Sequence, residues 1–200
     1  VIGIDASIGM INTAKKHKKK NLQFLNMDMA DMNFMNQFDV IYSNAALHWV
    51  KDHSRLLNQS YSALKPGGKI LWNFAGEGNC SDFFEIIRNM IQTEPYKKYF
   101  QSFQWPWYMP SKFEYEGLMN LTEFKNIVVT EENADRFFTD AEEMIGWIDQ
   151  PSLVPFMQYV PEELKEAFRN EVIDATLKRA IQPDGTCFQP FRRLKVSAVK

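Results

Sequence analysis

The sequence predicts an α/β protein built on a mostly parallel sheet that is covered on both faces. Three observations lead to this class. Short apolar runs alternate with helical patterns through the first half of the chain, as in strands joined by crossover helices. The first run, residues 1–5, ends on the carboxylate of Asp5 and is followed at once by a helix. The last run, residues 192–199, alternates apolar and polar residues and reads as a strand that returns beside residues 126–132.

The composition is that of an ordinary globular chain. Its 200 residues suffice for one domain with a core, and the 45% hydrophobic and 24% charged residues are typical of soluble proteins. A net charge of -2 gives no general attraction to nucleic acid or anionic membranes. Cys80 and Cys187 lie far apart without metal-ligand spacing, which favours a reducing cytoplasm and no metal site. No run is long enough to span a bilayer, and the first residues lack a signal-peptide pattern.

The first half of the chain is where strands and helices alternate. Leu56, Leu57, Tyr61 and Leu64 share one face of a helix, which the segment Pro66-Gly67-Gly68 ends. In chain order we expect strand 1–5, helix 8–17, strand 22–26, strand 38–43, helix 54–64, strand 69–74 and helix 83–91.

The second half has a different character. Its aromatic stretch, residues 99–113, is interrupted by prolines and reads as a loop or lid. Ser111 caps a short helix over residues 112–120, and Thr139 with Glu142 forms a capping-box pattern for another. Pro161 suits the first turn of a long helix over residues 162–180, and residues 183–186 form a turn before the last strand.

The order of these elements resembles the class I S-adenosylmethionine-dependent methyltransferases. The matching stretches are "GIDAS", "MD" after "LQFLN", "FDVIYSNAALHWV" and "ALKPGGKILWNF". The C-terminal half, ending in "PFRRLKVSAVK", is similar to the trans-aconitate methyltransferase group. The resemblance implies one domain over residues 1–200 with a helical insertion, or cap, at 139–183. It further implies a doubly wound, seven-stranded Rossmann-like sheet with an antiparallel last strand.

One part of the family pattern has no counterpart in the sequence, namely the first strand and its glycine-rich loop. The resemblance places that strand between strands 1–5 and 38–43. We therefore expect an N-terminally incomplete domain, preceded in the biological chain by the missing segment. We also expect that these two strands are not hydrogen-bonded to each other and that the 200-residue chain holds no ordered cofactor.

The cofactor residues implied by the resemblance follow the predicted strands. Asp5 would hold the ribose hydroxyls; its alternative role is a helix N-cap, for which Ser7 is the better candidate. Asp28 would accept a bond from the adenine amine, or else is a solvated loop acid. The full set expected to bind S-adenosylmethionine is Asp5, Ala6, Met10, Asp28, Met29, Asn44 and Ala45.

Candidate residues for the reaction itself are fewer, and each has a structural alternative. His48 could be a general base or a histidine packed beside Trp49. Trp105 and Trp107 could wall an acceptor pocket or form a small core under a long loop. Arg192 could bind an acceptor carboxylate or form a surface ion pair with one of the glutamates of the insertion.

The function expected from these residues is methyl transfer to a small acceptor, with a carboxylate oxygen as the nucleophile. We expect a cytoplasmic monomer without nucleic-acid or membrane partners. A nicotinamide-dependent dehydrogenase also uses an acid after its second strand, but the "KPGG" passage and the returning last strand argue against it. A binding protein that kept the fold without catalysis is the other alternative.

Overall fold

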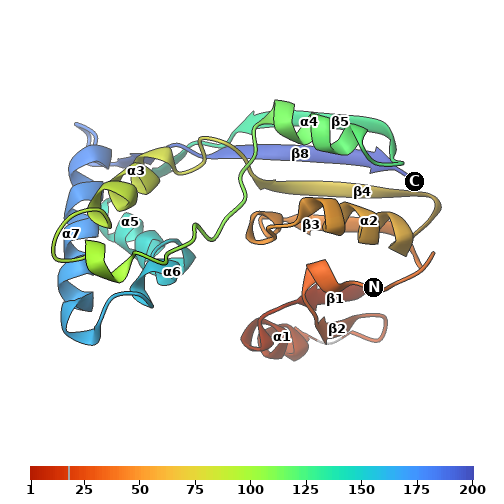
Figure 1. Cartoon of the computed structure of the whole chain (residues 1–200), viewed down its shortest axis with the longest axis horizontal. Coiled ribbons are helices and arrows are strands. Elements are labelled where there is room, and N and C mark those ends of the chain that lie inside the picture. Colours follow the sequence, from red (N-terminus) through yellow and green to blue (C-terminus); the bar gives the residue numbers. More distant parts are fainter. Residues whose placement is uncertain (18) are drawn as a thin grey trace. The chain divides into compact units, whose positions relative to one another are not determined.

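The computed structural model describes residues 1–17 and 19–200. The chain forms two compact units, each assembled from segments that are distant in sequence (Figure 1). Unit 1 comprises Val1–Phe74, Pro110–Thr130 and Leu194–Lys200. Unit 2 comprises Ala75–Met109 and Glu131–Arg193.

Unit 1 begins with a two-stranded parallel sheet. Strands β1 (Ile2–Asp5) and β2 (Gln23–Asn26) pair in the register Ile2 to Gln23 through Asp5 to Asn26. Helix α1 (Ile8–Ala14) joins them and continues as a 3-10 turn, Lys15–His17. The Ser7 side chain accepts a hydrogen bond from the Met10 N–H, so the predicted cap is confirmed.

A second sheet of unit 1 has the strand order β3-β4-β8-β5. Its members are β3 (Phe38–Asn44), β4 (Leu64–Ala75), β5 (Lys125–Asn133) and β8 (Arg192–Val199). β3 and β4 are parallel. β8 runs antiparallel to β4, since Lys200 is bonded to Gly67 and Gly68 at the start of β4 while Arg192 accepts a bond from Gly76 at its end. The expected antiparallel last strand beside β5 is confirmed, and β1 and β3 belong to different sheets, as expected.

Helices α2 (His53–Ala63) and α4 (Lys112–Asn120) cover one face of this second sheet (Figure 1). Under them lie the buried side chains of Ile70, Trp72, Phe74, Val129, Leu194, Val196 and Ala198. The opposite face is open, with Tyr42 70% and Val128 53% exposed. In the part of the chain that the structure describes, α2 and α4 lie on one face of this sheet, and helices on both faces stay a prediction. The alternation of buried and exposed residues along β4 is the pattern of a sheet covered on one side.

The "KPGG" passage, residues 65–68, lies in the first part of β4, directly after α2 ends. Gly67 adopts a φ of +78°, and a Cβ on Gly68 would lie 2.9 Å from the Lys65 carbonyl oxygen and 3.0 Å from that of Phe38. The register jumps here from Phe38 opposite Leu64 to Val40 opposite Lys69. The predicted helix end is confirmed, and the second glycine is required by close backbone approach.

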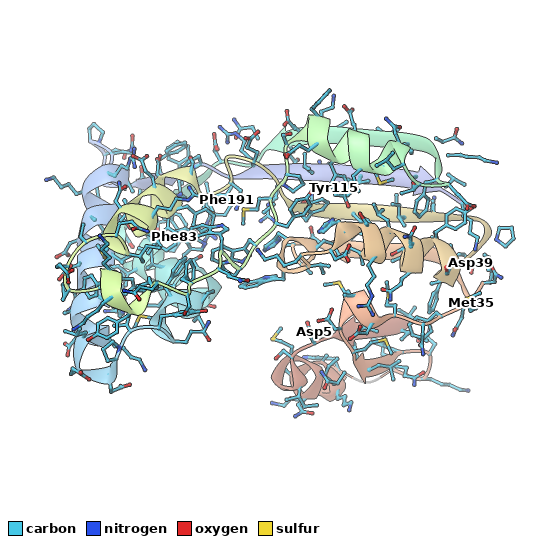
Figure 2. All side chains as sticks on the ribbon, in the orientation of Figure 1. Asp5, Met35, Asp39, Phe83, Tyr115 and Phe191 are labelled. Carbon is cyan, nitrogen blue, oxygen red and sulfur yellow. The ribbon has the colours of Figure 1, made fainter. Side chains whose placement is uncertain are left out.

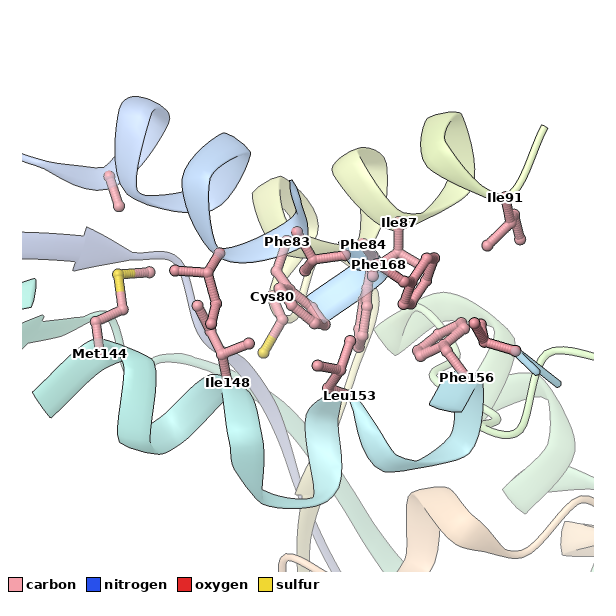
Figure 3. Close-up of a cluster of buried hydrophobic side chains, with 14 of the residues drawn as sticks. Cys80, Phe83, Phe84, Ile87, Ile91, Met144, Ile148, Leu153, Phe156 and Phe168 are labelled. Carbon is pink, nitrogen blue, oxygen red and sulfur yellow. The ribbon is translucent and has the colours of Figure 1, made fainter. Parts of the chain in front are cut away.

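Unit 2 is mostly helical. Its helices are α3 (Ser81–Met90), α5 (Ala141–Trp147), α6 (Val154–Met157) and α7 (Glu162–Ala180), with a π-type turn at Ile148–Ser152. A short antiparallel pair, β6 (Arg136–Phe138) with β7 (Cys187–Gln189), accompanies them. Their shared core includes Phe83, Ile87, Ile148, Phe156 and Phe168 (Figure 3). The predicted α3 and α7 are confirmed, whereas β6, β7 and α6 were not foreseen.

Residues 101–111 of the aromatic stretch have no helix or strand, which confirms the predicted loop, and Trp107 at 6% and Phe100 at 7% exposure pack it into the core. One expectation for unit 2 needs correction. The cap of α5 is one residue later than predicted: Asp140 accepts a bond from the Glu143 N–H. The Glu143 carboxylate reaches back to the N–H of Thr139, which lies before the cap.

Candidate functional site

Asp5 occupies the carboxyl end of β1, where ligands bind in open α/β sheets (Figure 2). Its Oδ1 accepts a hydrogen bond from the Ser7 N–H at 2.7 Å. The Asn26 side chain donates to the carbonyl oxygens of Asp5 and Ala6, both at 2.9 Å, and so fixes the turn between β1 and α1. Among the described residues Oδ2 has no partner and remains able to accept from a ligand hydroxyl.

Asp28 lies at the carboxyl end of the neighbouring strand, β2. Its Oδ1 accepts from the Ala30 N–H at 2.8 Å and caps the 3-10 turn Met29–Asp31. The nearby Asp31 is already held by Arg55, with 2.8 Å between Nη2 and Oδ1. Each of the two acids thus has one carboxylate oxygen engaged within the protein, and Asp28 lies nearer the end of β2. Because β1 and β2 are parallel neighbours, Asp5 and Asp28 follow the same edge of one sheet.

Asn44 and Ala45 end strand β3. Ala45 has a φ of +57°, which is uncommon for a residue with a Cβ, and its N–H donates to the Asn73 carbonyl at 2.7 Å. Asn44 lines a groove of about 320 Å³ on the open face of the second sheet, together with Asn73, Thr130 and Ser197. Of the two predicted methionine-end residues, Asn44 therefore borders a surface groove with several amide and hydroxyl groups, and Ala45 is not among the lining residues.

His48 lies in the 3-10 turn η3 (Leu47–Trp49) that follows β3. Its ring is half-buried and lies 5.9 Å from that of Trp49, at a tilt of 35°. This is the packing expected of the structural alternative. A role as a general base stays a prediction.

The buried histidine of unit 1 is His53, which the sequence reasoning passed over. Its side chain is 2% exposed and contacts the rings of Phe74 and Tyr115. Burial lowers the pKa of His53 to about 4, although the Leu47 carbonyl and Asp52 favour the charged form. The sequence does carry a pattern that predicts this burial, because His53 shares a helical face with the buried Leu56, Leu57 and Ser60.

The predicted acceptor residues belong to unit 2. The Trp105 and Trp107 rings lie 5.6 Å apart within the aromatic core, and Arg88 stacks on Trp105 at 4.5 Å. The structure thus brings these two residues together in the arrangement of the core alternative. Their acceptor role stays a prediction.

Arg192 is engaged with an acidic side chain of unit 2. Its Nη1 donates to Asp135, to Asn133 at 3.0 Å and to the Phe191 carbonyl at 2.9 Å. Partial burial opposes ionisation of Asp135, but bonds from the Phe191 N–H and Arg192 outweigh it and lower the pKa of Asp135. The ion-pair alternative is therefore observed, although the partner is Asp135 rather than a glutamate of the insertion.

Comparisons with known proteins identify the family of the chain. The family described as "Methyltransferase domain" matches residues 1–72. Trans-aconitate 2-methyltransferase of Mycobacterium tuberculosis is 30% identical over 197 residues, covering 96% of this chain and 72% of that protein. The chain belongs to the class I S-adenosylmethionine-dependent methyltransferase family. Within this family the methyltransferase is close to the trans-aconitate group, which confirms the resemblance found in the sequence.

Other relatives of the methyltransferase match only in part. Malonyl-[acyl-carrier protein] O-methyltransferase 1 of Ilyobacter polytropus is 35% identical over 102 residues, which are 50% of this chain and 37% of that protein. The solved structure of loganic acid methyltransferase with SAH has a TM-score of 0.75 at 9% identity, covering 100% of this chain and 73% of that one. At that identity the likeness shows the fold, which is Rossmann-like.

Two negative findings apply to the part of the methyltransferase that the structure describes. None of its helices is both long and apolar enough to cross a membrane. No cluster of three or more histidine, cysteine, aspartate or glutamate side chains has the geometry to hold a metal ion.

Proposed function

We propose that the protein transfers a methyl group from S-adenosylmethionine to a carboxylate oxygen of a small acceptor. The observation that carries the proposal is the 30% identity to trans-aconitate 2-methyltransferase over nearly the whole chain. The acceptors in the names of both relatives bear free carboxylates, since trans-aconitate is a tricarboxylate and a malonyl group ends in one. The chain spans 37% and 72% of these relatives, so the activity is proposed for the full-length protein.

The residues at the strand ends of unit 1 suit the cofactor. Oδ2 of Asp5 would accept from the ribose hydroxyls, and Asp28 would accept from the adenine amine beside the Met29 N–H. Ala6 and Met10 are exposed next to Asp5, where they would line the adenosine. Asn44 and Ala45 would border the methionine end. S-adenosylmethionine supplies, when bound, a methyl group that is already activated by a positively charged sulfur.

The protein's part in the reaction would be orientation and exclusion of water. A carboxylate acceptor is ionised near neutral pH and needs no base, which fits the packed position of His48. Arg192 uses Nη1 for its protein partners, while Nε and Nη2 have none among the described residues. We propose that these two nitrogens bind the acceptor carboxylate, that Trp105 and Trp107 belong to the acceptor pocket, and that the helices of residues 139–183 act as the cap.

The finer fold arrangement belongs to the same proposal. The described strand orders are β1-β2 and β3-β4-β8-β5. A single seven-stranded sheet would have these two groups on either side of one further strand, with β1 and β3 as that strand's neighbours.

The test is a methyl-transfer assay on the full-length protein. It would be incubated with S-adenosylmethionine labelled in the methyl group and with trans-aconitate or a malonyl thioester in separate reactions. We expect a labelled product that mild base hydrolyses to labelled methanol, because the product is a methyl ester. Absence of transfer to every carboxylate acceptor, or a product that survives base, would overturn the proposal.

A further inference from the structure

We infer that His53 is a positioning residue that fixes the turn after β3, residues 45–50, by a two-sided hydrogen bond. The inference rests on the proposed function in one respect, namely that this turn borders the transfer site. The geometry on which it stands lies entirely within unit 1.

His53 joins two elements that are far apart in sequence. Its Nε2 lies 3.0 Å from the Leu47 carbonyl oxygen, and its Nδ1 lies 2.8 Å from the Tyr115 hydroxyl. A carbonyl only accepts, so Nε2 carries the proton and Nδ1 accepts from the hydroxyl. The neutral ring therefore links α4, which carries Tyr115, to the turn that carries Leu47.

Both partners are shielded from water. His53 is 2%, Tyr115 0% and Leu47 1% exposed. A buried polar ring is unfavourable unless its nitrogens are bonded, so an apolar side chain would be the simpler filler for this space. The histidine is instead satisfied on both sides, which selects one orientation of the ring and one position of the Leu47 carbonyl.

The turn needs such an anchor because its backbone is unusual. Ala45 adopts a positive φ and is tied to β4 through the Asn73 carbonyl at 2.7 Å. At the other end the Leu47 carbonyl accepts from both the Val50 N–H, at 2.9 Å, and His53. Asn44 and His48 are attached to this doubly anchored segment, so its position sets where their side chains lie.

The first experiment compares His53→Asn with His53→Gln in the full-length protein. The glutamine amide nitrogen can occupy the place of Nε2 and donate to Leu47, whereas asparagine reaches only the place of Nδ1. We expect His53→Asn to lower kcat at least tenfold while changing the affinity for S-adenosylmethionine less than threefold. We expect His53→Gln to recover kcat to within threefold. Equal losses in the two variants would overturn the inference.

The second experiment does not depend on activity. Hydrogen exchange followed by mass spectrometry reports the amides of residues 44–52 directly, with a peptide from β8 as the internal control. We expect exchange in this turn to rise at least tenfold in His53→Asn and to stay near wild type in His53→Gln. If His53→Asn does not fold, Tyr115→Phe removes one hydroxyl and keeps the ring, and faster exchange in the same turn is expected. Unchanged exchange would overturn the inference, whereas altered exchange in a protein without transferase activity would overturn the proposed function alone.

Discussion

Arg169 grips Asp149 through two parallel hydrogen bonds, Nε to Oδ1 at 2.6 Å and Nη2 to Oδ2 at 2.5 Å. This pair ties α7 to the π-type turn after α5 within unit 2. The hydrogen bonds that Arg169 donates to Asp149 raise the pKa of Arg169. The two side chains are about a third exposed, so solvent weakens the attraction that the geometry would otherwise give.

Asp149→Asn is therefore expected to lower the free energy of unfolding by about 1 kcal/mol, because it removes a bidentate charge-assisted pair. Urea denaturation followed by circular dichroism measures this. Asp39→Asn is the matched control, since Asp39 is 80% exposed and faces the flexible Lys65. We expect the control to lower the free energy of unfolding by less than half as much. An equal decrease would contradict the idea that the bidentate geometry of the Arg169–Asp149 pair strengthens it.

Asp5→Asn is expected to weaken binding of S-adenosylmethionine by about 2 kcal/mol, roughly thirtyfold, because a hydrogen bond to a charged acceptor is replaced by a weaker one. Calorimetry on the full-length protein measures the affinity. Asp31→Asn is the matched control, because the Asp31 carboxylate is held by Arg55. Equal affinities of the Asp5 variant and wild type, with both folded, would refute the ribose assignment.

His48→Ala is expected to keep kcat within about fivefold of wild type, because a carboxylate nucleophile is already deprotonated at neutral pH. The measurement is the initial rate of methyl transfer to the best acceptor found. A loss of about a thousandfold, together with a base-stable product, would indicate a base mechanism on a different kind of acceptor.

Stability is expected to fall as the pH drops from 6.5 towards 4, because of His53. Its pKa is lowered by burial to about 4 in the folded protein, against about 6.5 in the unfolded chain. Between these values the unfolded chain binds the proton and the folded one does not, so acid favours unfolding. The free energy of unfolding should fall by about 2 kcal/mol more between pH 7 and pH 4.5 in wild type than in His53→Gln. Identical pH profiles would contradict the assignment of a buried neutral ring.

Gly68→Ala is expected to destabilise the protein by about 2 kcal/mol or more, because the new Cβ would press against two backbone carbonyl oxygens, the nearer at 2.9 Å. Gly117→Ala is the opposite case. Gly117 lies in α4. Apart from its chain neighbours and the backbone of its own helix, no described atom lies within 4 Å of the place that a Cβ would take. Alanine should therefore stabilise the helix by about 0.5–1 kcal/mol. Thermal unfolding of both variants measures these changes in stability. A Gly68→Ala variant as stable as wild type would contradict the close approach of the β3 and β4 backbones.

Elements with a strong local pattern were predictable from the sequence. β1, β3 and α7 lie within a residue or so of the expected bounds, because apolar periodicity and capping residues are local properties. β6 and β7 are three residues each and pair across about fifty residues of chain, so no local pattern could reveal them. The expectation of helices on both faces came from the alternation of apolar runs and helical patterns, which does not tell on which face of the sheet each helix lies.

For the candidate site, the residues at strand ends were predictable from the sequence, whereas contacts between distant segments were not. Asp5, Asp28 and Asn44 do follow parallel strands, which the strand ends alone indicated. The pairing of Arg192 with Asp135 and the burial of Trp107 depend on contacts between distant segments of unit 2, and sequence left both open. His53 was passed over because the expected helix began one residue later, although the spacing from His53 to Leu56 and Leu57 placed it on the buried face; its bond to Tyr115, 62 residues away, could not be predicted.

The strand order β3-β4-β8-β5 has a consequence for how the protein is made. β8 comes last in the sequence but lies between β4 and β5 in the sheet. During translation β5 has left the ribosome long before its neighbour exists, and it must wait with unpaired backbone groups while most of unit 2 is synthesised. Such late, long-range pairing slows folding and lengthens exposure to aggregation. Chaperone demand in the cell should therefore last until residues 192–199 emerge and enter the sheet.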